Sequence, residues 1–445
     1  MSDFIVTPAA AIGGDSPVPG DKSIGHRAFL FGALTDGRCA ITGLSGGEDN
    51  RRTAAALVAM GVRVEEDLAN KAAVVYGVGL GGLRAPAGPL DCGNSGTTMR
   101  LFCGLLAGQP FTSTLIGDPS LSKRPMRRVI TPLATMGAKI TGRGDVRPGD
   151  EVPPLIVTGG PLVGRTHHMT IASAQVKSAL VLAGLQAKGP TEIHEPGPTR
   201  DHTERILGGL GAPISTPSAG VVRVEPDGWD RRLRARDLSV PGDPSSAAFL
   251  IAAGALWGGT VRVPGVCLNP TRTGFVDALL AFGARVGSVE VVDVAGEPVG
   301  TLEITGGAAL TAATIDGPLV VRAIDEIPVL MTIAARAQGT TVVAGAEELR
   351  VKESDRVATT VAMLRAFGVE AEERPDGLVV HGRPDGALRP AEVDAHGDHR
   401  IAMAAAVLAL GAPGPTTIHD VDNVATSFPG FEATMARLGA VITRR

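Results

Sequence analysis

The sequence predicts an α/β protein made of six copies of one structural repeat, and two recurring phrases support this prediction. In the first phrase an apolar helix end precedes Gly, a small or apolar residue and a strand-like stretch, as in Met60-Gly61-Val62-Arg63-Val64. In the second a small or polar cap precedes an Ala- and Leu-rich helix, as in Asp398-His399-Arg400. Each phrase occurs six times at intervals of about 75 residues, which is typical of a repeat architecture.

The first phrase predicts the end of a helix at each of its glycines. A residue that ends a helix before a strand often adopts a positive φ, which glycine allows without steric cost. The six glycines are Gly61, Gly137, Gly211, Gly283, Gly368 and Gly439.

The second phrase predicts the start of a helix, because its polar side chains can accept hydrogen bonds from free helix N–H groups. The six caps begin at Asp21, Gly93, Ser173, Gly242, Asp325 and Gly397. Helices such as 28–34 and 402–410 are apolar nearly all round, so we expect them to be buried. Short β-rich stretches, including 73–76 and 377–380, lie between the phrases, so each repeat should hold two helices and several strands.

Composition excludes several classes of protein. The net charge of −4 and pI near 6.2 argue against a surface that binds duplex nucleic acid, and 3% aromatic residues argue against stacking on single strands. No apolar run reaches the length of a membrane helix, and no signal peptide is visible. The four cysteines form no CxxC pair, so neither a disulfide framework nor a zinc site is indicated. We expect a reduced cytoplasmic enzyme without metal or organic cofactor.

Cations gather at the caps and on two turns, 123–128 and 350–356. Helix N-termini attract anions, so these cations favour a site for a small ligand with several anionic groups. Taken singly, a Lys or Arg is more often a solvated surface charge, but this interpretation weakens where the cation lies between glycines and a buried helix, as Lys22 and Arg400 do. The cations at the caps are Lys22, Arg27, Arg100, Lys177 and Arg400, with His399 beside the last.

Two carboxylates stand near these cations and could act as general acid or base. Asp325 opens an apolar helix, and Glu353 lies between Lys352 and Arg356. Local sequence leaves a second interpretation open for each of them: an N-cap for Asp325 and a surface ion pair for Glu353.

Five motifs in one order resemble the 3-phosphoshikimate 1-carboxyvinyltransferase (EPSP synthase) family, from about residue 5 to the C-terminus. They are Pro19-Gly20-Asp21-Lys22-Ser23-Ile24-Gly25-His26-Arg27, Gly93-Asn94-Ser95-Gly96-Thr97-Thr98-Met99-Arg100, Lys123-Arg124-Pro125-Met126, Arg350-Val351-Lys352-Glu353-Ser354-Asp355-Arg356 and Asp398-His399-Arg400-Ile401-Ala402-Met403. The resemblance implies a two-domain inside-out α/β barrel with three βαβαββ repeats per domain around buried helices. The implied domains are 1–20 plus 241–445 and 21–240, with the active site in the cleft between them.

The family's reaction transfers the enolpyruvyl group of phosphoenolpyruvate to the 5-hydroxyl of shikimate 3-phosphate and releases phosphate, a step of the shikimate pathway of aromatic amino-acid biosynthesis. It proceeds by addition and then elimination through a tetrahedral ketal phosphate. Both substrates are polyanions, so a concentrated positive field is needed to bring them together. The resemblance implies no cofactor, no nucleic acid or membrane partner, and a monomer.

The resemblance assigns roles to matching positions. Asp325 would accept the proton of the 5-hydroxyl, while Glu353 and Lys22 are the candidates for proton donation. Shikimate 3-phosphate would contact Lys22, Ser23, Arg27, Ser173, Ala174, Gln175, Arg200, Asp325 and Lys352. Phosphoenolpyruvate would contact Lys22, Asn94, Gly96, Arg124, Gln175, Arg356, His399 and Arg400.

The sequence departs from the family pattern at a few positions. Leu101 stands where many members have Pro, and 425–429 contains no Lys where many members have one. Several further motifs, among them Asn269-Pro270-Thr271-Arg272, resemble the class II branch, which is often insensitive to glyphosate. A tolerant member of that branch has Ala at the position of Gly96, so we expect partial sensitivity here and a higher inhibitory concentration in Gly96→Ala.

Two other functions are compatible with part of the sequence. A UDP-N-acetylglucosamine enolpyruvyl transferase shares the fold and donor, but usually carries a Cys in the loop that corresponds to 117–124, where this chain has none. A non-catalytic anion-binding or RNA-end-processing protein on a related repeat fold is disfavoured by the full set of cations together with Asp325 and Glu353.

Overall fold

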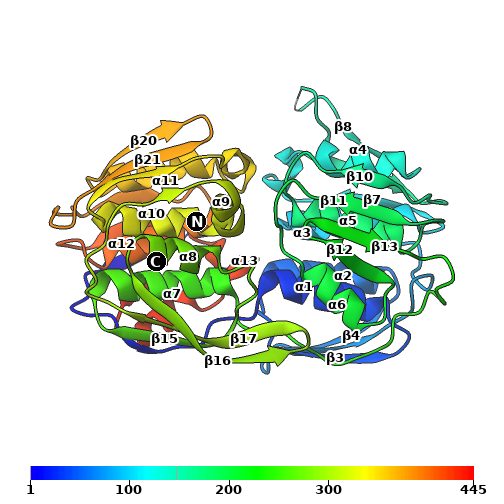
Figure 1. Cartoon of the computed structure of the whole chain (residues 1–445), viewed down its shortest axis with the longest axis horizontal. Coiled ribbons are helices and arrows are strands. Elements are labelled where there is room, and N and C mark those ends of the chain that lie inside the picture. Colours follow the sequence, from blue (N-terminus) through cyan, green and yellow to red (C-terminus); the bar gives the residue numbers. More distant parts are fainter. Residues whose placement is uncertain (1, 147) are drawn as a thin grey trace. The chain divides into compact units, whose positions relative to one another are not determined.

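The computed structural model describes residues 2–146 and 148–445, which divide into two compact units. Unit 1 comprises Met1–Asp21 and Pro241–Arg445, and unit 2 comprises Lys22–Val240. Each unit holds three four-stranded sheets (Figure 1). Within the described residues no helix is both long enough and apolar enough to cross a membrane.

Unit 2 mixes strands and helices along its whole length, with two or three strands in succession after some helices. Its strands are β3 (Arg38–Thr42), β4 (Arg63–Asp67), β5 (Ala72–Tyr76), β6 (Leu90–Asp91), β7 (Thr112–Ile116), β8 (Lys139–Arg143), β9 (Val152–Thr158), β10 (Thr166–His168), β11 (Thr191–His194), β12 (Ile214–Ser218), β13 (Val221–Val224) and β14 (Leu238–Ser239). Its helices are α1 (Lys22–Ala33), α2 (Glu48–Ala59), α3 (Gly96–Ala107), η1 (Leu121–Lys123), α4 (Arg127–Thr135), α5 (Ala174–Gly184) and α6 (His202–Gly209).

Unit 1 has the same mixture of strands and helices and includes both ends of the chain. Its strands are β1 (Phe4–Thr7), β2 (Gly14–Asp15), β15 (Thr260–Cys267), β16 (Arg285–Val294), β17 (Glu297–Thr305), β18 (Thr314–Ile315), β19 (Gly339–Val343), β20 (Glu370–Arg374), β21 (Gly377–Gly382), β22 (Glu392–Asp394), β23 (Thr416–His419) and β24 (Val441–Arg444). Its helices are α7 (Pro244–Trp257), α8 (Gly274–Ala281), α9 (Gly317–Ala323), η2 (Ile324–Glu326), α10 (Ile327–Arg336), η3 (Glu347–Val351), α11 (Arg356–Ala366), α12 (His399–Ala409), α13 (Val424–Ser427) and α14 (Phe431–Arg437).

The repeat predicted from the sequence is visible in the sheet that contains β6 to β9. Its elements run β6, α3, β7, η1, α4, β8, β9, and the strands lie in the order β6-β7-β9-β8. Strands β6 and β7 are parallel, while β9 is antiparallel to both β7 and β8. The same βαβαββ order recurs in the sheets of β10 to β13 and of β18 to β21.

Three repeats are completed by a strand from elsewhere in the chain. In unit 1, β1 pairs with β23 and β24 near the other end of the chain. The other two repeats take a strand that precedes a helix of the other unit. Strand β2 is followed directly by α1, yet it pairs in parallel with β15 in unit 1. Strand β14 is followed directly by α7, yet it pairs in parallel with β3 in unit 2. The chain therefore crosses between the units twice, each time between a strand and the next helix. It crosses from β2 in unit 1 to α1 in unit 2, and from β14 in unit 2 to α7 in unit 1.

The helices that follow the six caps form the interior of each unit, with the sheets outside. All eleven residues of α12 are buried, as are Pro244–Ala255 of α7, which confirms the expectation of buried helices. Helix α3 packs on α5 in unit 2, and α10 packs on both α7 and α12 in unit 1. At Gly104 in α3 an added Cβ would lie 2.1 Å from the carbonyl oxygen of Ala179 in α5, so this close approach requires glycine.

The first phrase has the predicted local structure at all six glycines, and the second has the predicted cap at four of its six positions. The six glycines that end helices have φ values of 90°, 102°, 86°, 81°, 86° and 98° in chain order. Ser95, Ser173, Asp243 and Asp398 cap α3, α5, α7 and α12 through hydrogen bonds from backbone N–H groups. The N-cap interpretation of Asp325 is wrong, because Asp325 lies within η2 and the residue that precedes α10 is Glu326, whose side chain makes no cap bond.

Candidate active site

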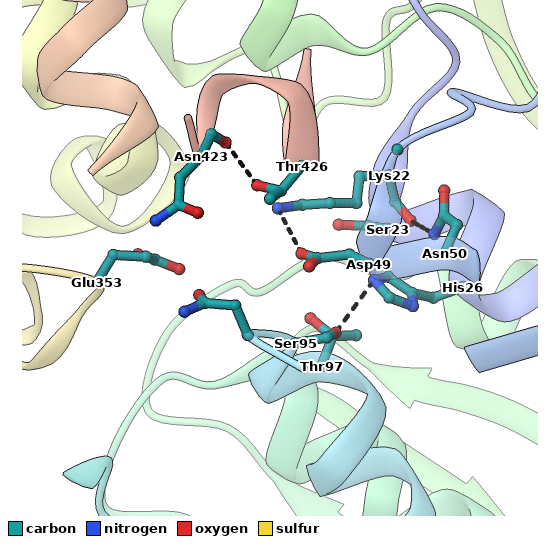
Figure 2. A network of polar contacts seen from close by, with 12 residues as sticks. Lys22, Ser23, His26, Asp49, Asn50, Ser95, Thr97, Glu353, Asn423 and Thr426 are labelled. Carbon is teal, nitrogen blue, oxygen red and sulfur yellow. Dashed lines mark hydrogen bonds and ion pairs between the residues drawn. The ribbon is translucent and has the colours of Figure 1, made fainter. Parts of the chain in front are cut away.

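The side chain and backbone of Lys22, the first residue of α1, are both held by α2. Its Nζ lies 3.1 Å from Oδ2 of Asp49, and its carbonyl accepts a hydrogen bond of 2.9 Å from Nδ2 of Asn50 (Figure 2). Asn50 packs against Gly25, where an added Cβ would lie 2.5 Å from Oδ1 of Asn50. Sequence reasoning missed both partners, although the acidic pair Glu48-Asp49 follows a glycine turn and could have indicated a helix start.

Arg27 lies one turn further along α1 and is 2% exposed. Its guanidinium donates to Oγ1 of Thr203 at 2.7 Å, to Oγ of Ser178 at 2.8 Å and to the carbonyl of Ser23 at 2.9 Å. Nη1 of Arg200 donates to Oγ of Ser23 at 3.2 Å. Ser23 is therefore linked to both arginines predicted to contact shikimate 3-phosphate.

Ser173, Ala174 and Gln175 lie at the start of α5. The Ser173 hydroxyl accepts from the N–H of Val176 and so caps the helix. The Gln175 amide is fixed at both ends, because its Oε1 accepts from Nη1 of Arg100 at 2.6 Å and its Nε2 donates to Oγ1 of Thr97 at 2.8 Å. Helix α3 thus sets the orientation of a side chain at the N-terminus of α5.

Asn94, Gly96 and Arg124 form a third part of the cluster in unit 2. Nη2 of Arg124 donates to Oδ1 of Asn94 at 2.6 Å, and Nδ2 of Asn94 donates to Oδ2 of Asp118 at 2.6 Å. An added Cβ at Gly96 would lie 2.8 Å from Nη1 of Arg100 and 3.4 Å from Nη1 of Arg124. The missing side chain at this position leaves room for two guanidinium groups.

Lys177 does not contribute a cation to this cluster, so that part of the expectation is wrong. Its side chain is 1% exposed, and its Nζ lies 2.9 Å from Oε2 of Glu195 and 2.7 Å from Oε1 of Glu204. Burial by itself would lower the pKa of Lys177, but the two glutamates outweigh it and the pKa is raised. The ammonium is engaged in a buried ion triad that joins α5 to α6.

In unit 1, Arg356 is the first residue of α11 and its side chain is 1% exposed among three carboxylates. Its Nη2 donates to Glu353 at 2.6 Å, its Nε to Asp398 at 2.8 Å and its Nη1 to Asp325 at 3.3 Å. Burial alone would lower the pKa of Arg356, but the carboxylates of Asp398, Glu353 and Asp325 raise it well above its ordinary value. One guanidinium therefore holds both predicted catalytic carboxylates.

Asp398, the cap of α12, holds the guanidinium of Arg356 in place. It is fully buried and accepts from the backbone N–H of Arg400 at 2.9 Å and from Oγ of Ser354 at 3.0 Å. Burial alone would raise the pKa of Asp398, but Arg356 outweighs burial and the pKa lies below its ordinary value. The sequence indicated Asp398 as a cap but not as the partner of Arg356.

Two further cations face the same cluster. Nη1 of Arg400 donates to the carbonyl of Asp325 at 2.7 Å and to Oε1 of Glu326 at 3.3 Å. Nζ of Lys352 lies 3.8 Å from Oδ1 of Asp325. His399 precedes Arg400 at the start of α12 and is buried.

The predicted site residues thus form two clusters, one within each unit. Both clusters lie at the N-terminal ends of helices, where free N–H groups and the helix dipole favour anions. Unit 2 holds Lys22, Ser23, Arg27, Asn94, Gly96, Arg124, Ser173, Ala174, Gln175 and Arg200. Unit 1 holds Asp325, Lys352, Glu353, Arg356, His399 and Arg400.

Six βαβαββ repeats with buried helices, three in each of two units, define the class of two-domain inside-out α/β barrels. The family model described as EPSP synthase (3-phosphoshikimate 1-carboxyvinyltransferase) matches residues 6–435, so the chain belongs to the EPSP synthase family.

Relatives and solved structures agree with this assignment over the whole chain. The 3-phosphoshikimate 1-carboxyvinyltransferase of Xanthomonas campestris pv. campestris (strain B100) is 48% identical over 444 residues, 99% of this chain and 98% of the relative. That of Alkalilimnicola ehrlichii is 50% identical over 446 residues, 99% of this chain and 97% of the relative. A solved structure of EPSP synthase from Acinetobacter baumannii has a TM-score of 0.87 at 40% identity and covers 100% of both chains.

Proposed function

We propose that this protein transfers the enolpyruvyl group of phosphoenolpyruvate to the 5-hydroxyl of shikimate 3-phosphate. The hydroxyl oxygen bonds to C2 of phosphoenolpyruvate while a proton adds to its methylene carbon, giving a ketal phosphate. A proton then leaves the methyl group and the C–O bond to phosphate breaks, which releases phosphate and restores the double bond. Membership of the EPSP synthase family supports this acceptor over UDP-N-acetylglucosamine.

The observation that carries the proposal is that Asp325 and Glu353 both accept hydrogen bonds from the buried guanidinium of Arg356. Two carboxylates that share a cation but lie on different elements, η2 and the turn before α11, can serve different proton-transfer steps. Asp325 takes the proton of the 5-hydroxyl. Glu353 and Lys22 supply protons to the methylene carbon and the leaving phosphate.

The cluster in unit 2 binds shikimate 3-phosphate in this proposal. The free N–H groups at the start of α5, beside Ser173 and Ala174, face the 3-phosphate, and Arg200 adds a cation. Ser23 accepts hydrogen bonds from both Arg200 and the buried Arg27. This supports two roles for Arg27: it holds Ser23 in position, and it adds positive charge to the site. Gln175, held by Arg100, lies beside the shikimate ring.

Phosphoenolpyruvate is clamped by cations of both clusters, Arg124 from unit 2 and Arg356 and Arg400 from unit 1. We propose that the substrates bind in the cleft between the two units, which closes around them and excludes water. The division of the proposed phosphoenolpyruvate contacts between the units supports this, because Arg124 belongs to unit 2 while Arg356 and Arg400 belong to unit 1. Asn94 and His399 complete the phosphoenolpyruvate contacts.

Phosphate release from phosphoenolpyruvate tests the proposal. Purified protein is assayed with shikimate 3-phosphate, with UDP-N-acetylglucosamine and with neither. Release that requires shikimate 3-phosphate supports the proposal, whereas release with the nucleotide sugar alone would keep the donor and replace the acceptor. Thermal stabilisation by phosphoenolpyruvate without turnover in any tube would favour a binding protein.

We further propose that the enzyme works as a monomer in a reducing compartment, the cytoplasm. Its four cysteines, Cys39, Cys92, Cys103 and Cys267, are free and buried, which suits a compartment that keeps thiols reduced. Burial raises the pKa of Cys103 to about 12, so this thiol is unreactive at neutral pH.

A further inference from the structure

The Asn269-Pro270-Thr271-Arg272 motif has no role in the proposed chemistry, yet its arginine is 3% exposed. Arg272 lies on the turn between β15 and α8. Its Nη2 lies 2.8 Å from Oδ1 of Asp243, 3.1 Å from Oδ2 of Asp21 and 3.1 Å from Oγ of Ser245. Burial alone would lower the pKa of Arg272, but the carboxylates around it raise the pKa well above its ordinary value, so the guanidinium is permanently charged.

Asp21 and Asp243 flank the two places where the chain passes between the units. Asp21 ends the first segment of unit 1 and is followed directly by Lys22, while Pro241 is where the chain returns. The two passing segments are also joined by their backbones. The N–H of Asp21 donates to the carbonyl of Pro241 at 2.7 Å, and the N–H of Asp243 donates to that of Pro19 at 2.9 Å. A single buried guanidinium therefore fastens both segments to unit 1.

The same guanidinium is connected to the phosphoenolpyruvate clamp through two side chains. The Ser245 hydroxyl, which accepts from Arg272, donates to the Glu326 carboxylate. Oε1 of Glu326 in turn accepts from Nη1 of Arg400 at 3.3 Å. Glu326 is buried, so its charge acts on these neighbours with little screening by water.

We infer that Arg272 is a positioning residue for this active site. It fixes the place where the chain leaves unit 1, directly before Lys22, and it fixes the orientation of Arg400. The inference rests on the proposed function. A guanidinium suits the task because its charge is permanent and its N–H groups point in fixed directions, here from Nη2 toward Asp243 and the Ser245 hydroxyl, whereas an ammonium group rotates freely.

The test compares Arg272→Lys, which keeps the positive charge but loses the planar guanidinium, with Met435→Ala as the control. Met435 is a fully buried core residue of α14 in the same unit and contacts none of this network through hydrogen bonds or ion pairs. Thermal unfolding of both variants establishes how much stability each loses. At a temperature well below both transitions, we expect Arg272→Lys to lower kcat about tenfold or more and to raise KM for phosphoenolpyruvate, because a misplaced catalytic group has this cost. Met435→Ala should retain both values within about twofold.

Amide hydrogen exchange supplies a readout that does not need turnover. Exchange at 19–23 and 241–245 should be faster in Arg272→Lys than in the wild type and unchanged in Met435→Ala. Kinetic constants of Arg272→Lys equal to those of Met435→Ala would overturn the inference, whatever the exchange result. So would unchanged exchange at both segments. If the wild type itself released no phosphate, the proposed function would fail, while the exchange data would still show whether Arg272 anchors the segments.

Should Arg272→Lys fail to fold, Asp21→Asn provides the same comparison. It removes one of the two aspartate charges beside Arg272 and keeps the shape of the side chain. A loss of kcat with retained thermal stability supports the inference, and unchanged kinetic constants with unchanged local exchange refute it.

Discussion

Gly96→Ala is the most sensitive test of the geometry of the proposed phosphoenolpyruvate site, because the added methyl group would contact the guanidinium of Arg100, which is already hydrogen-bonded to Gln175. The new Cβ would lie 2.8 Å from Nη1 of Arg100, at least about 0.5 Å inside ordinary van der Waals contact. Nη1 of Arg100 cannot withdraw freely, since the same atom donates to Gln175 at 2.6 Å. The variant therefore strains or breaks a charge-assisted hydrogen bond at the start of α5.

The expected size follows from that bond. A hydrogen bond to a charged group contributes about 1.5–3 kcal/mol, and each 1.4 kcal/mol is about a factor of ten in binding. We therefore expect KM for phosphoenolpyruvate to rise about tenfold. The inhibitory concentration of glyphosate should rise more than this, because glyphosate is the longer ligand and the methyl shortens the space beside Arg124.

The assay is phosphate release at several glyphosate concentrations, with Gly208→Ala as the control. Gly208 lies on the exposed side of α6, where an added Cβ would meet only a side-chain carbon of Ile214 at 3.7 Å. The control should match the wild type in KM and inhibition. An inhibition curve of Gly96→Ala that coincides with that of the wild type would refute the reasoning.

Three further variants test the packing and charge of the fold. Lys177→Met leaves two buried glutamates uncompensated and should lower the free energy of unfolding in urea by about 3–5 kcal/mol, and an unchanged midpoint would contradict a buried triad. Asp398 has a lowered pKa in the folded state, so its ionisation stabilises the fold above about pH 4, and this contribution is lost as pH falls through the folded pKa. Asp398→Asn should thus be less stable than the wild type near neutral pH, and the gap in melting temperature should narrow on acidification. A gap that stays constant down to about pH 3 would mean that Arg356 does not hold the carboxylate charged. Gly104→Ala places a methyl 2.1 Å from the backbone of Ala179 and should destabilise the fold by about 1–3 kcal/mol or more in thermal unfolding, so a neutral effect would show that α3 and α5 separate at low cost.

The repeat could be predicted from the sequence because helix ends have local chemical requirements. Positive φ at Gly61 and at the five equivalent glycines follows from the need to leave a helix and enter a strand. Buried helices such as α7 and α12 could be predicted because their own residues are apolar on nearly every side of the helix. These features depend on residues only a few positions apart.

The exchange of β2 and β14 could not be predicted in the same way. Each strand has two residues, Gly14–Asp15 and Leu238–Ser239, which is too short for an alternating pattern. Their partners β15 and β3 lie hundreds of residues away in the chain. Only the packing of complete units determines which sheet each strand joins.

The site was predicted in its residue types but not in its internal contacts. The sequence indicated cations at caps and carboxylates beside them, and the structure places them in two such clusters. It did not indicate that Arg100 would hold Gln175, 75 positions away, or that Arg356 would bind Asp398. It also misread Lys177 as a ligand cation, because nothing local shows that Glu195 and Glu204 meet it in the fold.

The measurement that tests the central claim most directly is kcat of Asp325→Asn, determined by phosphate release with both substrates present. Calorimetric binding of shikimate 3-phosphate to the same variant reports whether the site is intact. The account predicts a fall of kcat by about 10²–10⁴ with affinity for shikimate 3-phosphate within about tenfold of the wild type, because the side chain keeps its shape and loses its ability to take a proton. A variant that binds shikimate 3-phosphate and turns over at the wild-type rate would contradict the assignment of Asp325 as the group that accepts the proton.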